Sequence, residues 1–144
     1  MERVGTDVDG FLSSFSEGVR ETMTELDAIV TSCLPGRTRT LWEGTFWGGT
    51  EQRIVGYGKI EQARPRGEPV EWFLVGLARQ RSYHSLYVNA IEEGTPLLGR
   101  YADRLGKVKV GSASVSFADL AAVDVDVLRE MLTRAHELAP PDGA

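Results

Sequence analysis

The sequence predicts an α+β fold, in which helices pack mainly on one face of an antiparallel sheet of about five to six strands. Two kinds of segment support this prediction. Segments near both ends of the chain have apolar residues at helical spacing, whereas the middle contains short segments that are alternating or continuously apolar. The connections between the middle segments are short, and short connections favour antiparallel neighbours.

The N-terminal helical segment covers residues 9–34, either as one helix or with a break near residues 14–16. Proline at position 35 and glycine at position 36 end it, because proline cannot continue a helix and glycine tolerates the turn. Its apolar residues recur at steps of three and four and form one stripe. The stripe consists of Val19, Met23, Leu26, Val30 and Cys33.

The middle of the chain is predicted to form four strands, at residues 39–46, 53–60, 72–78 and 83–89. The third is almost continuously apolar, which indicates a central strand buried on both faces. In the fourth, His84, Leu86 and Val88 share one face of the strand. In the second, Gly56 and Gly58 share a face, where a backbone or a ligand could approach closely.

The C-terminal part returns to helical patterns. A second helix is predicted at residues 95–106, with Thr95 as its N-cap. Short strands are predicted around residues 107–110 and 114–117. Asp124 is the predicted N-cap of a last, amphipathic helix.

The length of 144 residues, with 42% hydrophobic and 26% charged residues, indicates one globular domain. We assign that domain to residues 6–139 and interpret residues 1–5 and 140–144 as flexible tails. The beginning of the chain lacks the apolar core of a signal peptide, and no apolar run approaches the length of a membrane span. The single cysteine, Cys33, cannot form an internal disulfide. These features predict a cytoplasmic protein without a membrane partner.

The net charge of −5 is concentrated in one segment. Residues 6–34 contain six acidic residues and one basic residue, and the rest of the chain is balanced. No basic segment typical of nucleic-acid binding is present, so we expect no nucleic-acid partner. Glu17, Glu21 and Glu25 lie four residues apart, opposite the apolar stripe. They are either a local cluster of hard oxygen ligands, which would suit ferrous iron, or a solvated helix face.

The sequence lacks the usual catalytic and nucleotide-binding motifs. It contains no phosphate-binding loop, no dinucleotide-binding glycine pattern and no nucleophile elbow. Cys33, His84 and His136 lie far apart in the sequence, so a zinc enzyme is not expected. Enzymatic activity is left open, with a non-enzymatic role without a cofactor favoured, because no nucleophile–base pair or metal set is visible.

Aromatic residues from the predicted strands, with one titratable group, form a candidate ligand pocket. The candidates are Trp42, Trp47, Tyr57, Trp72, His84 and Tyr87. Lys107 and Lys109 follow in the sequence and would favour an anionic group on the ligand. The alternative is that these aromatic side chains simply fill the core, since aromatic residues dominate core burial.

Several short motifs are spread over residues 8–137. They are Leu41-Trp42-Glu43, residues 54–58, Gly76-Leu77, Ser85-Leu86-Tyr87, Leu105-Gly106-Lys107 with Lys109 and Gly111, and residues 124–129. The motif that begins at Leu105 and the motif at residues 124–129 are the most specific. Together they resemble the YdhG-like family, also called domain of unknown function 1801. The resemblance implies a compact α+β domain. Where that family often has Lys, Ser and Cys after Gly111, this chain has Ser112, Ala113 and Ser114.

Three functions remain in view. The first is a non-enzymatic module that binds a small ligand in the aromatic pocket. The second is a frataxin-like iron chaperone, a role assigned to some YdhG-like proteins, which here would use Glu17, Glu21 and Glu25. The third is a protein-interaction domain or a homodimer, which an exposed apolar sheet face would favour.

Overall fold

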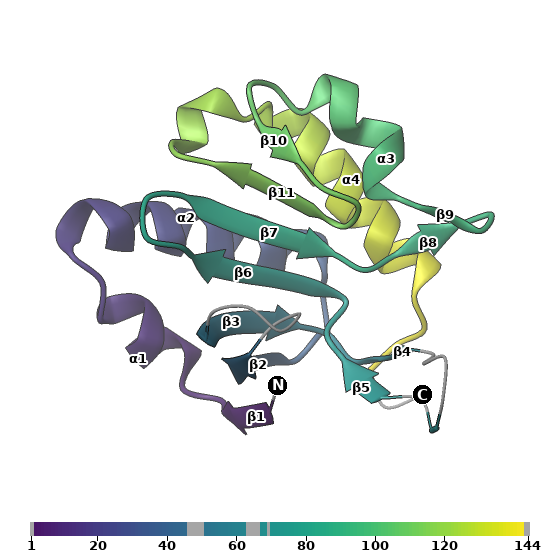
Figure 1. Cartoon of the computed structure of the whole chain (residues 1–144), viewed down its shortest axis with the longest axis horizontal. Helices are drawn as coiled ribbons and strands as arrows, with labels where there is room; N and C mark the ends of the chain where they lie inside the picture. The colour runs from purple at the N-terminus through teal and green to yellow at the C-terminus, as the bar shows by residue number, and fades with distance from the viewer. Residues whose placement is uncertain (1, 46–50, 63–66, 69, 143–144) are drawn as a thin grey trace.

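The computed structural model describes residues 2–45, 51–62, 67–68 and 70–142. Its main sheet has seven strands in the order β1-β2-β3-β6-β7-β11-β10, and every neighbouring pair is antiparallel (Figure 1). These strands are β1 (Glu2–Gly5), β2 (Arg39–Thr45), β3 (Glu51–Tyr57), β6 (Val75–Arg79), β7 (His84–Val88), β10 (Lys109–Val110) and β11 (Ser114–Phe117). Two small sheets pair β4 (Ile60–Gln62) with β5 (Val70–Trp72), and β8 (Ile91–Glu92) with β9 (Thr95–Pro96).

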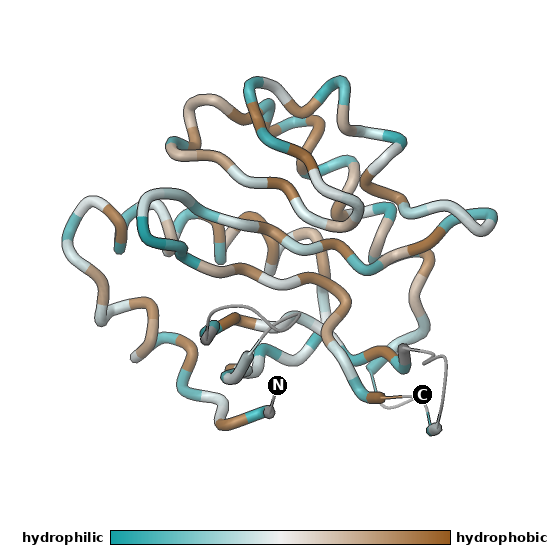
Figure 2. Tube along the Cα trace, viewed as in Figure 1, coloured by the Kyte–Doolittle hydropathy of each residue, from teal (hydrophilic) through white to brown (hydrophobic). Residues whose placement is uncertain are grey.

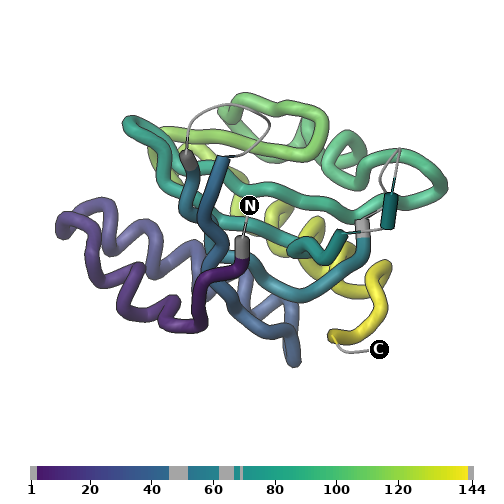
Figure 3. The backbone as a smooth tube through the Cα atoms, turned by 60° about the horizontal axis from the view of Figure 1, so that its bottom comes forward, coloured from purple at the N-terminus to yellow at the C-terminus, as the bar shows by residue number. Residues whose placement is uncertain are grey.

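Helices pack on one face of this sheet, so the predicted α+β fold is confirmed (Figure 3). The α-helices are α1 (Val8–Ser13), α2 (Glu17–Cys33), α3 (Leu98–Tyr101) and α4 (Val125–Leu138), with short 3-10 helices at Ala102–Arg104 and Leu120–Ala122. The predicted break near residues 14–16 separates α1 from α2. Asp124 caps α4 as expected, since its Oδ1 accepts a hydrogen bond from the backbone N–H of Val127 at 3.2 Å. Within the described residues, no helix is both long and apolar enough to cross a membrane.

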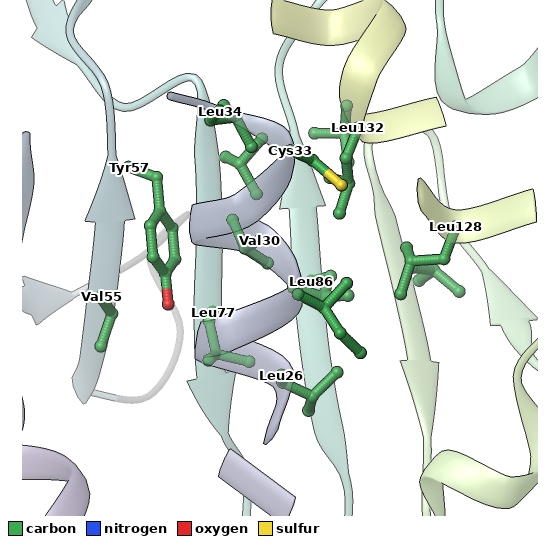
Figure 4. Close-up of a cluster of buried hydrophobic side chains, with 14 of the residues drawn as sticks. Leu26, Val30, Cys33, Leu34, Val55, Tyr57, Leu77, Leu86, Leu128 and Leu132 are labelled. Carbon is green, nitrogen blue, oxygen red and sulfur yellow. The ribbon is translucent and has the colours of Figure 1, made fainter. Parts of the chain in front are cut away.

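The main hydrophobic core lies between the helices and the sheet. Leu26 and Val30 of α2 and Leu128 of α4 face Leu77 and Leu86 of the central strands (Figure 4). All five side chains are fully buried, and each such side chain stabilises the fold by roughly 1.5–3 kcal/mol. Hydrophobic residues also recur along β6 and β7 in Figure 2, which is the expected pattern for strands in the middle of a sheet.

A second, smaller cluster covers part of the opposite face of the sheet. It consists of Trp42, Ile54, Phe73, Ala78 and Tyr87, with Trp72 packed against it. The predicted close approach at Gly56 is occupied by protein side chains. A Cβ at Gly56 would lie 2.5 Å from Nε1 of Trp42 and 2.9 Å from Cβ of Phe73. Gly58 has a different role, because its φ of +81° lets the chain turn at the end of β3.

The predicted strand at residues 72–78 is two strands. Trp72 ends β5, which pairs with β4, whereas β6 begins at Val75 and joins the main sheet. Between them, Phe73 packs in the second cluster and Leu74 in the main core. The run is continuously apolar because side chains on both faces are buried. This pattern does not reveal that the segment contains two strands, β5 and β6, with different pairing partners.

Two further expectations were wrong. The predicted tail at residues 1–5 contains β1, which pairs with β2 and adds a seventh strand to the sheet. The predicted helix at residues 95–106 begins later, because Thr95 lies in β9 and the regular helical turns start at Leu98. The partner of β1 is distant in sequence, so the local pattern does not record it. Thr95 instead pairs with Glu92 in the short β8–β9 hairpin, and this turn takes the place of the first helical turn.

The predicted C-terminal tail is anchored up to residue 142 by Arg37, whose side chain is only 3% exposed. Its guanidinium donates hydrogen bonds to the backbone oxygens of His136 and Ala139, each at 3.1 Å, and of Pro140 at 2.5 Å. It also donates from Nε to Nδ1 of His136 at 3.1 Å and forms an ion pair with Asp142 at 3.2 Å. His136 lies in the last turn of α4 and Ala139 is its C-cap, where helix carbonyls otherwise lack partners, and Pro140 follows directly.

Asp142 is the acceptor at the centre of this C-terminal clasp, which we define as Arg37, His136 and Asp142. Its carboxylate accepts hydrogen bonds from the backbone N–H of Thr38 at 2.7 Å and of Lys59 at 3.0 Å. Burial alone would raise the pKa of Asp142, but these hydrogen bonds and the Arg37 guanidinium hold that pKa below its usual value. The clasp thus joins the end of the chain to β2 and to the turn after β3.

Candidate functional site

The described members of the predicted aromatic pocket do not come together, because they lie on opposite faces of the sheet. Trp42 and Tyr87 belong to the second cluster, whereas Tyr57 is in the main core. The Tyr57 hydroxyl donates a hydrogen bond to Asp27 of α2 at 2.8 Å. Burial, followed by the negative charge of Asp27, raises the pKa of Tyr57 well above its ordinary value. Trp47 lies outside the described residues.

His84 lies on the helix-covered face and is 2% exposed. Its Nε2 lies 3.1 Å from Nη1 of Arg79, which stands directly opposite on β6. Burial, together with the positive charge of Arg79, lowers the pKa of His84 to about 4, so the ring is neutral at pH 7. Arginine can only donate, so Nε2 accepts and the ring proton must be on Nδ1. That Nδ1 is buried and has no hydrogen-bond partner within the described part of the chain.

A surface hollow of about 730 Å³ lies next to Arg79, at the end of the sheet where the β6–β7 turn approaches α1. The turn is on the left in Figure 1 and is strongly hydrophilic in Figure 2. We call this feature the arginine hollow. The described residues that line it are Phe11, Ser14, Phe15, Gln52, Arg53, Arg79, Gln80, Arg81 and Tyr83.

The three arginines of this hollow differ in their partners. Arg53 pairs with Glu43 at 2.7 Å, and its guanidinium lies 4.9 Å from the ring centre of Phe11. Arg79 contacts the neutral His84, and Arg81 is exposed in the turn. Across residues 2–45, 51–62, 67–68 and 70–142, no carboxylate forms an ion pair with Arg79 or Arg81. The hollow therefore has positive charges at Arg79 and Arg81 that no described carboxylate neutralises through an ion pair.

Sequence reasoning missed these arginines, although a signal exists. Ile54 of β3 pairs with Ala78 of β6 in an antiparallel register. Arg53 precedes Ile54 and Arg79 follows Ala78, so both arginines come to the same end of the sheet. Arg81 follows directly in the turn. Basic residues at the matching ends of successive antiparallel strands are the pattern that would have indicated the site.

Lys107 and Lys109 lie together at a second hollow of about 540 Å³, which we call the lysine hollow. Its described lining residues are Tyr83, Lys107, Lys109, Val110, Gly111, Ser114, Ser116, Phe117 and Ala118. None of the predicted pocket aromatics, and not His84, is among them. Tyr83 lines both hollows and is 42% exposed. The structure thus places the predicted lysines next to an aromatic residue that sequence reasoning did not select.

The acidic row of α2 gives no support to the iron alternative. Glu17, Glu21 and Glu25 are exposed. In the described part of the chain, no group of three His, Cys, Asp or Glu side chains is arranged to hold a metal ion. Iron binding by this row stays a prediction from the sequence.

Comparisons with known proteins add no relative. The chain matches no protein-family model, and no curated protein or solved structure is detectably similar to it. The resemblance to the YdhG-like family therefore stays a prediction that rests on the motifs themselves. Any function assigned to this chain has to be argued from the chemistry of its own hollows.

Proposed function

We propose that this protein is a binding module for a small anionic ligand, and that the arginine hollow is its binding site. One observation supports this above all: Arg79 and Arg81 line a hollow of suitable size, and no described carboxylate pairs with either of them. Sites for small molecules usually have volumes of about 300–1,000 Å³, with a few polar groups that fix the ligand. The ligand is a small molecule, as expected from the sequence, but the residues that bind it differ from the predicted aromatic pocket.

The lining suits a phosphate or carboxylate group. A guanidinium is a planar fork of donors that matches both oxyanions, and such charge-assisted hydrogen bonds are roughly twice as strong as neutral ones. Gln52 and Gln80 provide further polar groups, and Gln80 Nε2 already donates to Gln52 Oε1 at 2.8 Å. Phe11 and Phe15 provide an apolar wall, with their rings 5.1 Å apart. The hollow thus offers charge, hydrogen bonds and apolar surface to one ligand.

His84 gives Arg79 a preferred orientation. A neutral imidazole holds the guanidinium through one hydrogen bond without cancelling its charge, whereas a carboxylate would neutralise it. This arrangement leaves the buried N–H at Nδ1 without a described partner, and an unsatisfied buried donor costs roughly 1–3 kcal/mol. An unsatisfied buried donor in a folded protein usually has a functional explanation. Here the explanation is that His84 holds Arg79 in place for a ligand.

The test is a thermal-shift titration of the whole chain with inorganic phosphate, citrate and nucleoside monophosphates at constant ionic strength. A ligand at 100 times its dissociation constant stabilises the folded state by about 2.7 kcal/mol, which is readily measured. The stabilisation should be lost in the double variant Arg79→Gln, Arg81→Gln. It should persist in Arg20→Gln, which removes an exposed arginine of α2 that has no side-chain partner within the described residues.

An equal shift in the double variant and in the wild-type protein would show that the anion binds elsewhere. The absence of any shift with all these anions would also contradict the proposal. Ferrous iron under anaerobic conditions belongs in the same screen, with the triple variant Glu17→Gln, Glu21→Gln, Glu25→Gln as the test of the iron alternative.

A further inference from the structure

The arginine hollow and the lysine hollow meet at one residue. Tyr83 lines both, and it stands at the end of the β6–β7 turn. Its backbone position is fixed by a hydrogen bond from the N–H of Gln80 to the Tyr83 carbonyl at 2.8 Å. A ligand that fills one hollow and extends past Tyr83 would therefore reach the other.

The described lining of the two hollows has charges of one sign only. It includes Arg53, Arg79, Arg81, Lys107 and Lys109, and it includes no carboxylate. Removing these five positive charges from the net charge of −5 leaves −10 on the rest of the chain. The basic side chains around Tyr83 thus form a positively charged region on an otherwise acidic protein. The electrostatic potential of such a region attracts a compact anion.

We propose that the two hollows form one site for a ligand with two anionic groups and one planar aromatic ring, of the class of the nucleoside bisphosphates, in which both phosphates and the base are attached to the ribose. This inference rests on the proposed function of the arginine hollow. One phosphate is bound by the Arg79 and Arg81 forks, the ring stacks on Tyr83, and the second phosphate lies between Lys107 and Lys109. Aromatic stacking contributes about 1–3 kcal/mol per base, which makes Tyr83 a substantial part of the site.

The hydroxyls of the lysine hollow fit this assignment. Ser114 and Ser116 lie two residues apart on β11, so their side chains share one face of the strand. Lys109 pairs with Ser116 across β10 and β11, which brings an ammonium and a hydroxyl to the same place. Ser116 Oγ lies 3.2 Å from Ser85 Oγ, and a hydroxyl with two acceptor positions and one donor retains capacity for a phosphate oxygen.

A compact ligand is favoured over a nucleic-acid strand by the charge of the remaining surface. A strand that follows the groove would continue beyond it, where the rest of the chain has a net charge of −10 once the five groove cations are set aside. Repulsion there would oppose each additional phosphate. A bisphosphate places its charges only where the five basic side chains lie.

The test is calorimetric titration of the whole chain with adenosine 3′,5′-bisphosphate and with adenosine 5′-monophosphate at one ionic strength. We expect the bisphosphate to bind at least about tenfold more tightly. The double variant Lys107→Gln, Lys109→Gln should remove that difference and leave monophosphate affinity within about twofold. Tyr83→Ala should weaken both nucleotides by about tenfold and leave inorganic phosphate unaffected. Arg20→Gln is the matched control and should change none of these affinities.

The outcomes separate this inference from the proposed function. Equal affinity for the two nucleotides, or a difference that survives in the lysine variant, would overturn the inference while the arginine hollow remains an anion site. Failure of every phosphate compound to bind would overturn both. A single-stranded oligonucleotide of about 10 nucleotides that binds more tightly than the bisphosphate would also overturn the inference, because it would identify a strand as the ligand.

Discussion

Arg37 and Arg79 show two opposite uses of the same side chain. Arg37 is nearly inaccessible and donates to three backbone carbonyls, to His136 and to Asp142. Arg79 has one described side-chain partner, the neutral ring of His84, and lines a surface hollow. The N–H groups of Arg37 are used by contacts within the protein, and its charge is paired with Asp142. Arg79 has no described ion pair, and most of its N–H groups remain available to a ligand. An arginine is a candidate for ligand binding when its charge and its hydrogen-bond donors have few partners within the protein.

The largest effect is expected when the satisfied arginine is removed. Arg37→Ala should lower the free energy of unfolding by about 3–5 kcal/mol, since it leaves Asp142 buried without its charged partner and frees the carbonyls at the end of α4. Urea denaturation of Arg37→Ala beside Arg20→Ala measures this difference. A loss no larger than that of the Arg20 variant would contradict the role of the clasp.

The next effect is a pH dependence at the other end of the sheet. The pKa of His84 is lowered from 6.5 to about 4 in the folded protein, so between these pH values the unfolded chain binds a proton that the folded chain does not. Stability should therefore rise with pH across this window, by about 3 kcal/mol in total. Denaturation midpoints at several pH values measure the slope. His84→Gln, which does not titrate, should flatten it, and an unchanged slope would contradict the buried neutral ring.

Asp142 gives a smaller effect in a separate, more acidic window. Asp142→Asn replaces one accepting oxygen by a donating group and should cost about 1.5 kcal/mol at pH 7. The pKa of Asp142 is lowered in the folded state, so its stabilising contribution is complete above its ordinary value of 3.8 and is lost as the pH falls through the folded pKa. The wild-type and variant stabilities should therefore converge only in strong acid, whereas convergence near pH 6 would assign the effect to another group.

The smallest effect on stability is expected for the unsatisfied arginine of the turn. Arg81→Gln should change the free energy of unfolding by less than about 0.5 kcal/mol, because the side chain is exposed and has no described partner. The same variant should weaken phosphate binding by about tenfold, which corresponds to about 1.4 kcal/mol. Urea denaturation measures the free energy of unfolding of the variant, and calorimetry measures its phosphate affinity. We expect the first to stay nearly unchanged and the second to fall. If both were unchanged, Arg81 would have no part in the site.

Helices α1, α2 and α4 could be predicted from the sequence because their signals are local. Met23, Leu26 and Val30 recur at helical spacing, and the structure buries all three. The break between α1 and α2 and the cap at Asp124 are recorded within a few residues of where they act. Cys33 lies buried at the end of the same apolar stripe, as its spacing indicates.

The aromatic residues could not be assigned to one site, because alternation orders residues within a strand and says nothing about the register between strands. Trp42 pairs with Ile54, so the two share a face, whereas Tyr57 lies three residues further along β3 and points to the opposite face. The pairing of β2 with β3, and not the composition of either strand, separates Trp42 from Tyr57. The same holds for β1, which is a strand because β2 provides a partner.

The fold class and the inner faces of α2 and α4 follow from the amino-acid sequence alone, since they depend on the spacing of residues that are close in the chain. Which charged side chains have a partner and which do not becomes visible only in the folded protein. In the sequence, Arg37 and Arg79 look alike, since each lies near a predicted strand and is followed two residues later by another arginine. Arg37 is neutralised by the carboxylate of Asp142 and donates to the ring of His136, both about 100 residues away, whereas the ring of Arg79's partner His84 is neutral and no described carboxylate pairs with Arg79. Whether a charged side chain has an ion-pair or hydrogen-bond partner depends on residues that folding brings together from distant parts of the chain. The local sequence pattern does not identify these residues.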